Sequence, residues 1–132
     1  MTDIETKIHK IARDVYESLG SGHPEVVYNR AMQVDLRLQS INYESEKVLE
    51  VKYKGHYVGD GHADLVVGSG DDMVVVELKV GAYLLGDPEK QQLNNYMKSL
   101  GVKKGVLINF QKPEARRSKP SNHAGPEFIL IE

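Results

Sequence analysis

The stretch ADLVVGSGDDMVVVELKV, residues 63 to 80, has the pattern of two apolar strands joined by a turn. Charged side chains interrupt both apolar runs, at Asp64, Glu77 and Lys79. A charge on a buried strand destabilises the fold by several kcal/mol unless a partner compensates it. The pattern therefore predicts that these three charges meet at one place and interact there.

The register of this hairpin can be predicted from its turn. If the chain turns symmetrically about Gly70 and Asp71, the numbers of opposed residues sum to 141, and Asp64 faces Glu77. Directly opposed residues have Cβ atoms ~4.5–5.5 Å apart. Strand alternation places Lys79 on the same face as Glu77. Because the other face is also apolar, we expect helices to cover both sides of these strands.

Two opposed carboxylates at this distance repel each other by ~3 kcal/mol when the effective dielectric constant is about 20. Lys79 offsets part of this repulsion, and one excess negative charge remains. A divalent cation would neutralise it, and oxygen ligands favour Mg²⁺ or Mn²⁺ over zinc. An ammonium group beside a metal-bound water suits chemistry at a phosphorus centre. The alternative is a structural Asp–Lys–Glu cluster that holds no metal.

Length and composition indicate one globular domain, residues 1–132, with 40% hydrophobic and 27% charged residues. The absence of cysteine excludes disulfides, zinc ribbons and thiol nucleophiles, and it is compatible with the cytoplasm, where we expect the protein. No apolar run of 18 residues is present, and the first residues lack the apolar core of a signal peptide. We therefore expect no membrane association.

The remaining sequence predicts three helices. The first spans residues 3 to 19, with Thr2 and Glu5 as a capping box and Gly20 as its stop. The second runs from Pro24 to about residue 39. The third opens at Asp87-Pro88, with Asp87 as its N-cap and Pro88 in the first turn, and ends at residue 101. The residues that we expect the second helix to bury are Val27, Ala31, Val34 and Leu38.

Strand patterns fill most of the rest. Residues 43 to 60 predict a hairpin that turns at Lys54-Gly55, and further strand covers 62–68 and 73–80. A short buried strand at 105–110 and a final edge strand, EFILIE, complete the chain. The order α-α-β-β-β-α-β-β is that of a single mixed α/β domain.

A basic segment lies near the C-terminus, although the net charge of the chain is −2. It is either a solvated loop or a surface that contacts phosphates. The loop residues that we expect to grip a nucleic-acid backbone are Lys112, Arg116, Arg117 and Lys119. Alternative contact surfaces are the first hairpin, with Lys52 and Lys54, or a groove completed by a second subunit.

The charged hairpin resembles the PD-(D/E)xK nuclease superfamily, with Asp64 as the first acid and Glu77-Leu78-Lys79 as the ExK triplet. The segment GHPEVVY, residues 22–28, is similar to the signature of the GxxExxY protein family, a branch of that superfamily. QLNNY at 92–96 and GVLINF at 105–110 extend the resemblance, which covers roughly residues 3 to 110. It implies a restriction-endonuclease-like core, a mixed central β-sheet flanked by helices.

The resemblance also implies roles for individual residues. Asp64 and Glu77 would ligate Mg²⁺ or Mn²⁺, helped by the backbone carbonyl of Leu78, and Lys79 would act on the attacking water. Glu25 matches an acid that many superfamily members add to the metal site, whereas the alternative is that it complements the positive end of its helix. Gln92 matches a helix glutamine near the site.

Several assignments keep an alternative. Gln92 is otherwise a solvated side chain, and Gln91 takes its place if the register is shifted by one. Tyr96, one turn later, is a candidate contact to nucleic acid, whereas Tyr28 is expected to pack in the core. Where family members often carry arginine, this chain has His62, which could be an extra ligand, a phosphate contact or a packing residue. A His/Asp/Glu metal site of another hydrolase type is therefore a rival.

The function that the resemblance implies is metal-dependent hydrolysis of phosphodiester bonds, with DNA rather than RNA as the substrate. The C-terminal EFILIE lacks the basic ending associated with the family, and the sequence leaves the oligomeric state open. The competing class is a catalytically silent module on the same fold that binds nucleic acid or another protein.

Overall fold

The structure, a computed structural model, describes residues 3–81, 85–111 and 125–132. Its elements follow the predicted order, with a short 3₁₀ turn at Gly70–Asp72 between the second and third strands. The elements are α1 (Ile4–Leu19), α2 (Glu25–Leu38), β1 (Tyr43–Tyr53), β2 (His56–Val67), β3 (Val74–Lys79), α3 (Asp87–Leu100), β4 (Lys104–Asn109) and β5 (Glu127–Ile131).

The described strands form one mixed sheet in the order β1-β2-β3-β4-β5. The strands β3 and β4 are parallel, and the other neighbours are antiparallel. The predicted register of the β2–β3 hairpin is confirmed, since the pairs Leu65–Val76, Val66–Val75 and Val67–Val74 all sum to 141. The final strand β5 lies at an edge of the sheet, as predicted.

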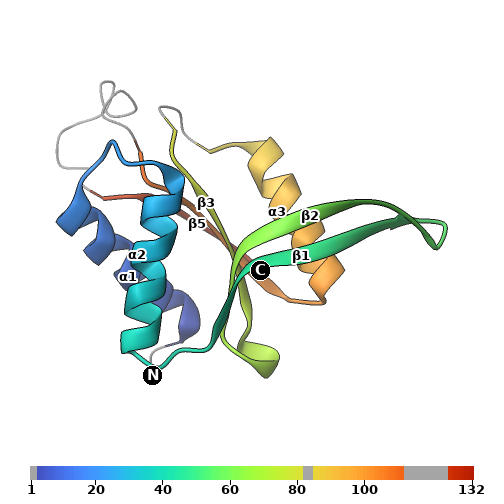
Figure 1. Cartoon of the computed structure of the whole chain (residues 1–132), viewed down its shortest axis with the longest axis horizontal. Coiled ribbons are helices and arrows are strands. Elements are labelled where there is room, and N and C mark those ends of the chain that lie inside the picture. The colour runs from blue at the N-terminus through green and yellow to red at the C-terminus, as the bar shows by residue number, and fades with distance from the viewer. Residues whose placement is uncertain (1–2, 82–84, 112–124) are drawn as a thin grey trace.

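Helices cover both faces of the sheet (Figure 1), as the apolar β3 and β4 sequences predict. The helices α1 and α2 share one apolar cluster with the first face, and α3 shares another with the second face. Tyr28 belongs to the first cluster, where its ring stacks on Phe110 with centroids 4.3 Å apart. Its hydroxyl donates to the carbonyl of Gly20 at 2.6 Å, so Tyr28 packs in the core as expected. None of the described helices is long and apolar enough to cross a lipid bilayer.

The predicted buried face of α2 is wrong at Val34 and Leu38, whereas Ala31 is partly buried against the first apolar cluster. The buried residues are Tyr28, Asn29, Met32 and Leu36, whereas Val34 and Leu38 are 45% and 77% exposed. The helix carries apolar residues on two adjacent stripes, and the stripe with the larger side chains, Tyr28 and Met32, fills the core. Because both stripes are apolar, the sequence of α2 alone could not show which of them faces the core.

Two helix caps also differ from prediction. The N-cap of α1 is Asp3, whose Oδ1 accepts the Thr6 backbone N–H at 2.8 Å, and Thr2 lies outside the described residues. Asp is as good an N-cap as Thr or better, because its carboxylate reaches the free N–H groups of the first turn. The N-cap of α3 is Gly86 rather than Asp87, and the Gly86 N–H donates to Glu89 Oε1 at 2.9 Å.

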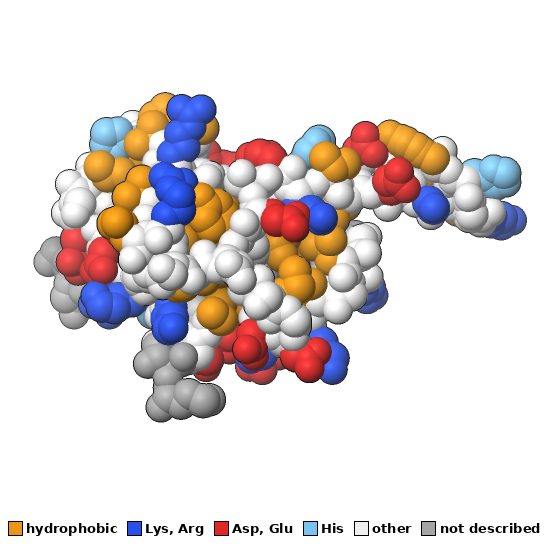
Figure 2. Space-filling view, turned by 60° about the horizontal axis from the view of Figure 1, so that its bottom comes forward, with side chains coloured by type: hydrophobic (Ala, Val, Ile, Leu, Met, Phe, Trp, Pro, Cys, Tyr) orange, Lys and Arg blue, Asp and Glu red, His pale blue; other side chains and the backbone are white. Residues whose placement is uncertain are grey.

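The β1–β2 hairpin extends well beyond the rest of the sheet (Figures 1 and 2). It turns at Lys54 and Gly55, as predicted, with both residues in the left-handed region at φ 51° and 80°. The strand β2 is continuous from His56 to Val67, without the predicted break before residue 62. A bulge shifts the pairing from Lys52–Tyr57 to Val51–Gly59, which leaves Val58 as the extra residue.

Close packing between α3 and β4 predicts the effect of Gly105→Ala. A Cβ at Gly105 would lie 2.6 Å from Sδ of Met97 and 2.9 Å from Cδ2 of Leu93, both on buried side chains. We expect the overpacked variant to lose about 1–3 kcal/mol of unfolding free energy, measured by denaturant titration. The control is Gly59→Ala on β2, where an added Cβ meets nothing within 4 Å. Equal losses in the two variants would contradict the close approach of α3.

Candidate active site

The predicted charged residues meet at the point where β2 and β3 separate. Backbone pairing between these strands ends at Leu65–Val76, one position before Asp64 and Glu77. The backbone N–H of Asp64 donates to Glu77 Oε1 at 3.0 Å, and that of Leu78 donates to Asp64 Oδ2 at 2.8 Å. Each carboxylate thus accepts from the backbone of the opposite strand, so the two side chains replace the next rung of the ladder.

The strand β2 turns over at this position. Ala63 packs in the cluster beneath α3, whereas Leu65 packs in the cluster beneath α1 and α2. Residues two apart on a regular strand point to the same face. The alternation therefore breaks at Asp64, and the predicted geometry of a regular ladder with all three charges on one face is wrong. Asp64 and Glu77 are neighbours through their backbone contacts instead.

Glu46 on β1 lies opposite this break, and no motif in the sequence marks it as a site residue. The β1–β2 pairs on either side, Ser45–Leu65 and Lys47–Ala63, both sum to 110, and Glu46–Asp64 is the pair missing between them. Glu46 has φ 52°, a left-handed conformation that costs a non-glycine residue about 1–2 kcal/mol. Its charge raises the pKa of Asp64, so Glu46 adds to the negative field of the site.

Glu77 is the most strongly perturbed of these acids. Its side chain is buried, and burial, followed by the charge of Asp64, raises its pKa to about 8. The pKa of the half-buried Asp64 is also raised, first by burial, although the hydrogen bond from Leu78 acts in the opposite direction. At neutral pH the pair therefore holds a proton on Glu77 unless a cation takes its place.

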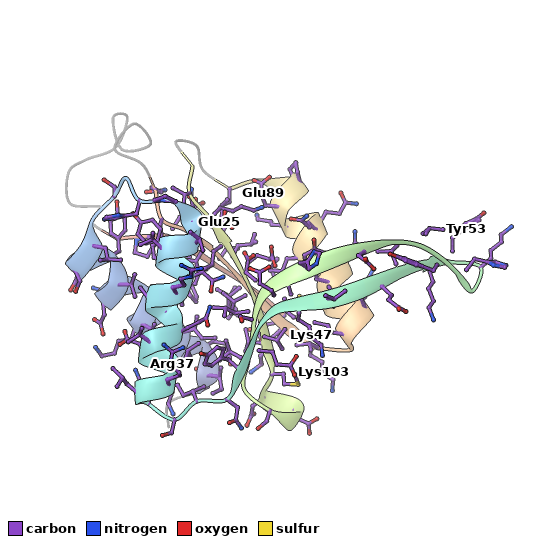
Figure 3. All side chains as sticks on the ribbon, viewed as in Figure 1. Glu25, Arg37, Lys47, Tyr53, Glu89 and Lys103 are labelled. Carbon is purple, nitrogen blue, oxygen red and sulfur yellow. The ribbon has the colours of Figure 1, made fainter. Side chains whose placement is uncertain are left out.

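Lys79 and Glu25 belong to the same electrostatic cluster. Lys79 is half-buried at the end of β3, and its charge lowers the pKa of Glu77, Asp64 and Glu25. Glu25 begins α2 and lies at the end of that helix near β3 (Figure 3). Its pKa is raised by desolvation first and by the charge of Asp64 second, which favours the site over simple complementation of the helix end. Glu25 also lines a groove of about 390 Å³ with Val80, the residue after Lys79.

Gln92 and Tyr96 lie beside the acidic cluster and not inside it. Gln92 Nε2 donates to the Tyr96 hydroxyl at 3.2 Å. The Tyr96 ring packs on Gly61, three residues before Asp64 on β2, where an added Cβ would lie 2.9 Å from Cε1. With Gln91 they line a groove of about 710 Å³ between α3 and the β1–β2 hairpin. His62 is exposed on β2.

The predicted phosphate contacts on the C-terminal loop lie outside the described residues. They are Lys112, Arg116, Arg117 and Lys119, and their role stays a prediction.

Comparison with known proteins now adds a family to this geometry. Residues 2–119 match the sequence model of the PD-(D/E)XK nuclease superfamily. The chain belongs to the PD-(D/E)XK nuclease superfamily. The mixed sheet with helices on both faces agrees with the restriction-endonuclease-like fold that this membership implies.

A solved structure described as "Crystal structure of SSO0001" is similar to the chain, with a TM-score of 0.56 and 19% sequence identity. The match covers 81% of this chain and 49% of that one, so the chain spans about half the length of that protein. At this identity the likeness supports the fold alone. No curated protein matches the chain.

PD-(D/E)XK nucleases use divalent metal ions, and the donor set at this site can be compared with that requirement. Asp64 and Glu77 supply hard carboxylate oxygens, and each uses one oxygen to accept a backbone N–H. Within the part of the chain that the structure describes, no three His, Asp or Glu side chains converge closely enough to hold a metal. Mg²⁺ is usually bound by one or two carboxylates together with water and substrate phosphates. Two carboxylates therefore fit such an ion, while ligation by Glu25 and by the Leu78 carbonyl stays a prediction.

The raised pKa of Glu77 predicts how stability depends on pH in the PD-(D/E)XK domain. The folded value of about 8 lies above the ordinary 4.5, so the folded state binds a proton that the unfolded state has released. This contribution is present below about pH 4.5 and is lost as the pH rises through 8. At about 1.4 kcal/mol for each pKa unit, it amounts to a few kcal/mol.

In a metal chelator, the unfolding free energy of Glu77→Gln minus that of the wild type should therefore increase from about pH 5 to about pH 8. Denaturant titrations at each pH measure this difference. The exposed Glu50→Gln is the matched control and should show no such trend. A constant difference for Glu77→Gln would show that Glu77 ionises like a solvated glutamate.

Proposed function

We propose that the protein is a divalent-metal-dependent nuclease that hydrolyses phosphodiester bonds of DNA, and that it belongs to the GxxExxY branch of its superfamily. The observation that carries the proposal is the pair of buried Glu77 and half-buried Asp64, joined through the separating strands β2 and β3, with Lys79 beside it. Two neighbouring acids that are buried or half-buried and have raised pKa values are unfavourable for stability alone, which supports a functional purpose.

Each residue has a distinct task in the proposed reaction. Asp64 and Glu77 would hold Mg²⁺ or Mn²⁺, and Glu77 would have to be deprotonated to do so. The cation, when bound, supplies Lewis acidity and a more acidic water. Lys79 donates hydrogen bonds to the attacking water or to the phosphate oxygens, whose negative charge increases in the transition state. Water adds to phosphorus as the bond to the leaving oxygen breaks, the attacking water loses a proton to solvent, and the leaving oxygen takes up a proton from solvent.

The other site residues act around this centre. Glu25 extends the acidic cluster from α2 and contributes a further ligand or orients a bound water. Gln92 and Tyr96 position the nucleic-acid strand next to the cleaved bond, because the groove that they line adjoins β2 near Asp64. The cytoplasmic location and a homo-oligomeric state stay predictions.

Cleavage assays test the proposal directly. We expect purified protein with Mg²⁺ or Mn²⁺ to cut at least one substrate among single-stranded, duplex and branched DNA and RNA. Lys79→Ala should reduce the rate by about 10²–10³-fold, because it removes one preorganised donor at the developing charge. Lys103→Ala, an exposed lysine labelled in Figure 3, should leave the rate unchanged. No cleavage of any substrate, or equal cleavage by Lys79→Ala, would disprove the proposal.

Metal binding should also stabilise the fold. Because a cation held by Asp64 and Glu77 would bind the folded state and not the unfolded one, millimolar Mg²⁺ or Mn²⁺ should raise the melting temperature by linkage. Glu77→Gln should abolish this response and, without metal, should melt no lower than the wild type. Thermal denaturation with and without each cation measures both effects, and a wild-type melting temperature that ignores both cations would refute the metal site.

The second candidate is a catalytically silent module that binds nucleic acid on the same fold. It is favoured by the hydrogen bonds that Asp64 and Glu77 accept from the backbone, since these give both acids a structural role without a metal. Gel-shift binding without turnover, unaffected by Asp64→Ala, would support this candidate over the enzyme.

A further inference from the structure

The outer part of the β1–β2 hairpin, residues 51–59, forms an arm that projects from the body of the protein (Figures 1 and 2). The last residues of the hairpin that pack closely on α3 are Leu49, in the apolar cluster beneath that helix, and Gly61, against the Tyr96 ring. Beyond them the arm carries large exposed side chains. Tyr53, Tyr57 and Val58 are 63%, 54% and 61% exposed. Exposed tyrosines are common at interaction sites, because the ring offers apolar contact area while the hydroxyl stays hydrogen-bonded.

The tip of the arm is basic. Lys52, Lys54 and His56 lie between residues 51 and 59, and this segment contains no acid. The nearest acids, Glu50 and Asp60, lie at the base of the arm, where Glu50 Oε2 is 3.9 Å from Lys52 Nζ in an exposed pair. The Lys54 ammonium lies 5.3 Å from the centroid of the Tyr53 ring. This charge is complementary to a polyanion, although the whole chain carries −2.

Both faces of the arm carry the same chemistry. Lys52 is paired with Tyr57, and Tyr53 is paired with His56. Successive cross-strand pairs point to opposite faces of a two-stranded ribbon. Each face of the tip therefore presents one nitrogen-bearing side chain and one aromatic ring. A ligand that surrounds the ribbon, with negative charge on both sides, matches this arrangement better than a flat surface does.

The major groove of B-form DNA has these properties. It is about 12 Å wide, admits a two-stranded β-ribbon, and has a phosphate backbone along each side. The major groove of A-form RNA is too deep and narrow for such an element. A second copy of the arm is a poor partner, because it would bring Lys52 and Lys54 against the same lysines.

We propose that this arm inserts into the major groove of duplex DNA and contacts the substrate at a distance from the bond that is cleaved. The inference rests on the proposed nuclease function and extends it to a substrate class, DNA that contains a duplex segment. Eight residue steps along β2 separate His56 from Asp64. At ~3.4 Å per residue the arm reaches ~27 Å from the acidic cluster. Since base pairs are ~3.4 Å apart, this contact lies ~8 base pairs from the active site.

Binding is measured on the full chain carrying Lys79→Ala, so that turnover does not consume the DNA. Fluorescence anisotropy over a salt series gives the affinity for a duplex of about 20 base pairs, which spans site and arm, and for one of about 6, which does not. In this background, Lys52→Glu/Lys54→Glu should weaken binding of the long duplex by about tenfold or more. It should also reduce the salt slope of log K by about 1.8, the value for two lost phosphate contacts. Affinity for the short duplex and for duplex RNA should change little.

The matched control is Lys10→Glu/Arg13→Glu, the same charge change on exposed residues of α1. It should leave the affinity and the salt slope for the long duplex unchanged. Tyr53→Ala/Tyr57→Ala should weaken binding of the long duplex without changing the salt slope, because it removes packing and no charge. Unchanged melting temperatures would confirm that these variants fold.

The inference is overturned if no variant binds duplex DNA or if Lys52→Glu/Lys54→Glu leaves the affinity for the long duplex unchanged. It is also overturned if Lys10→Glu/Arg13→Glu weakens binding equally. It is also overturned if the wild type is a dimer that the tyrosine variants dissociate while DNA affinity stays constant, since a second copy would then cover the arm. Failure of the proposed function is distinct: arm-dependent binding by a wild type that cuts nothing with Mg²⁺ or Mn²⁺ retains the arm inference and refutes the nuclease.

Discussion

The structure depends on one pair of hydrogen bonds, in which two side-chain carboxylates take the place of backbone carbonyls as acceptors at the end of the β2–β3 ladder. Asp64 and Glu77 accept the backbone N–H groups of Leu78 and Asp64 across the gap between the strands. These bonds offset part of the cost of burying the two acids, and they hold both side chains in fixed positions. The strands can therefore separate here without leaving either of these N–H groups without an acceptor.

The separation gives the two strands different functions. The strand β3 stays within the sheet, where its parallel pairing with β4 continues to Lys79 and the Lys79 carbonyl accepts the N–H of Phe110 at 2.9 Å. Asn109 Oδ1 accepts the N–H of Gly81 at 2.9 Å, which secures the chain just beyond Lys79. The strand β2 instead leaves β3 and continues with β1 into the projecting hairpin (Figure 1). The strand β3 thus fixes Glu77 and Lys79 within the sheet, and the hairpin extends from Asp64 toward the proposed substrate.

Much of this arrangement could be predicted from the sequence, because it follows from local patterns. The β2–β3 register follows from apolar alternation about one short turn, and three observed pairs confirm it. The reversal of β2 and β1 at Asp64 and Glu46 could not be predicted. A symmetric turn at Lys54-Gly55 pairs residues that sum to 109, which places Ser45 opposite Asp64, and only the extra residue Val58 shifts this sum to 110. The buried face of α2 depends similarly on the stacking of Tyr28 on Phe110, a contact between residues far apart in the sequence.

The burial of Glu77 beside a second acid explains why the site is unfavourable for stability and suited to binding a cation. Burial and the charge of Asp64 raise the pKa of Glu77 to about 8, so a cation that binds the pair displaces a proton and takes over its role of neutralising the charge. Glu46, in a left-handed conformation opposite Asp64, adds negative charge where a structural role would require none. Backbone strain and buried like charges are features that folding alone disfavours, and proteins retain them at functional sites. A fold that concentrates both at the end of one strand pair is therefore arranged around its chemistry.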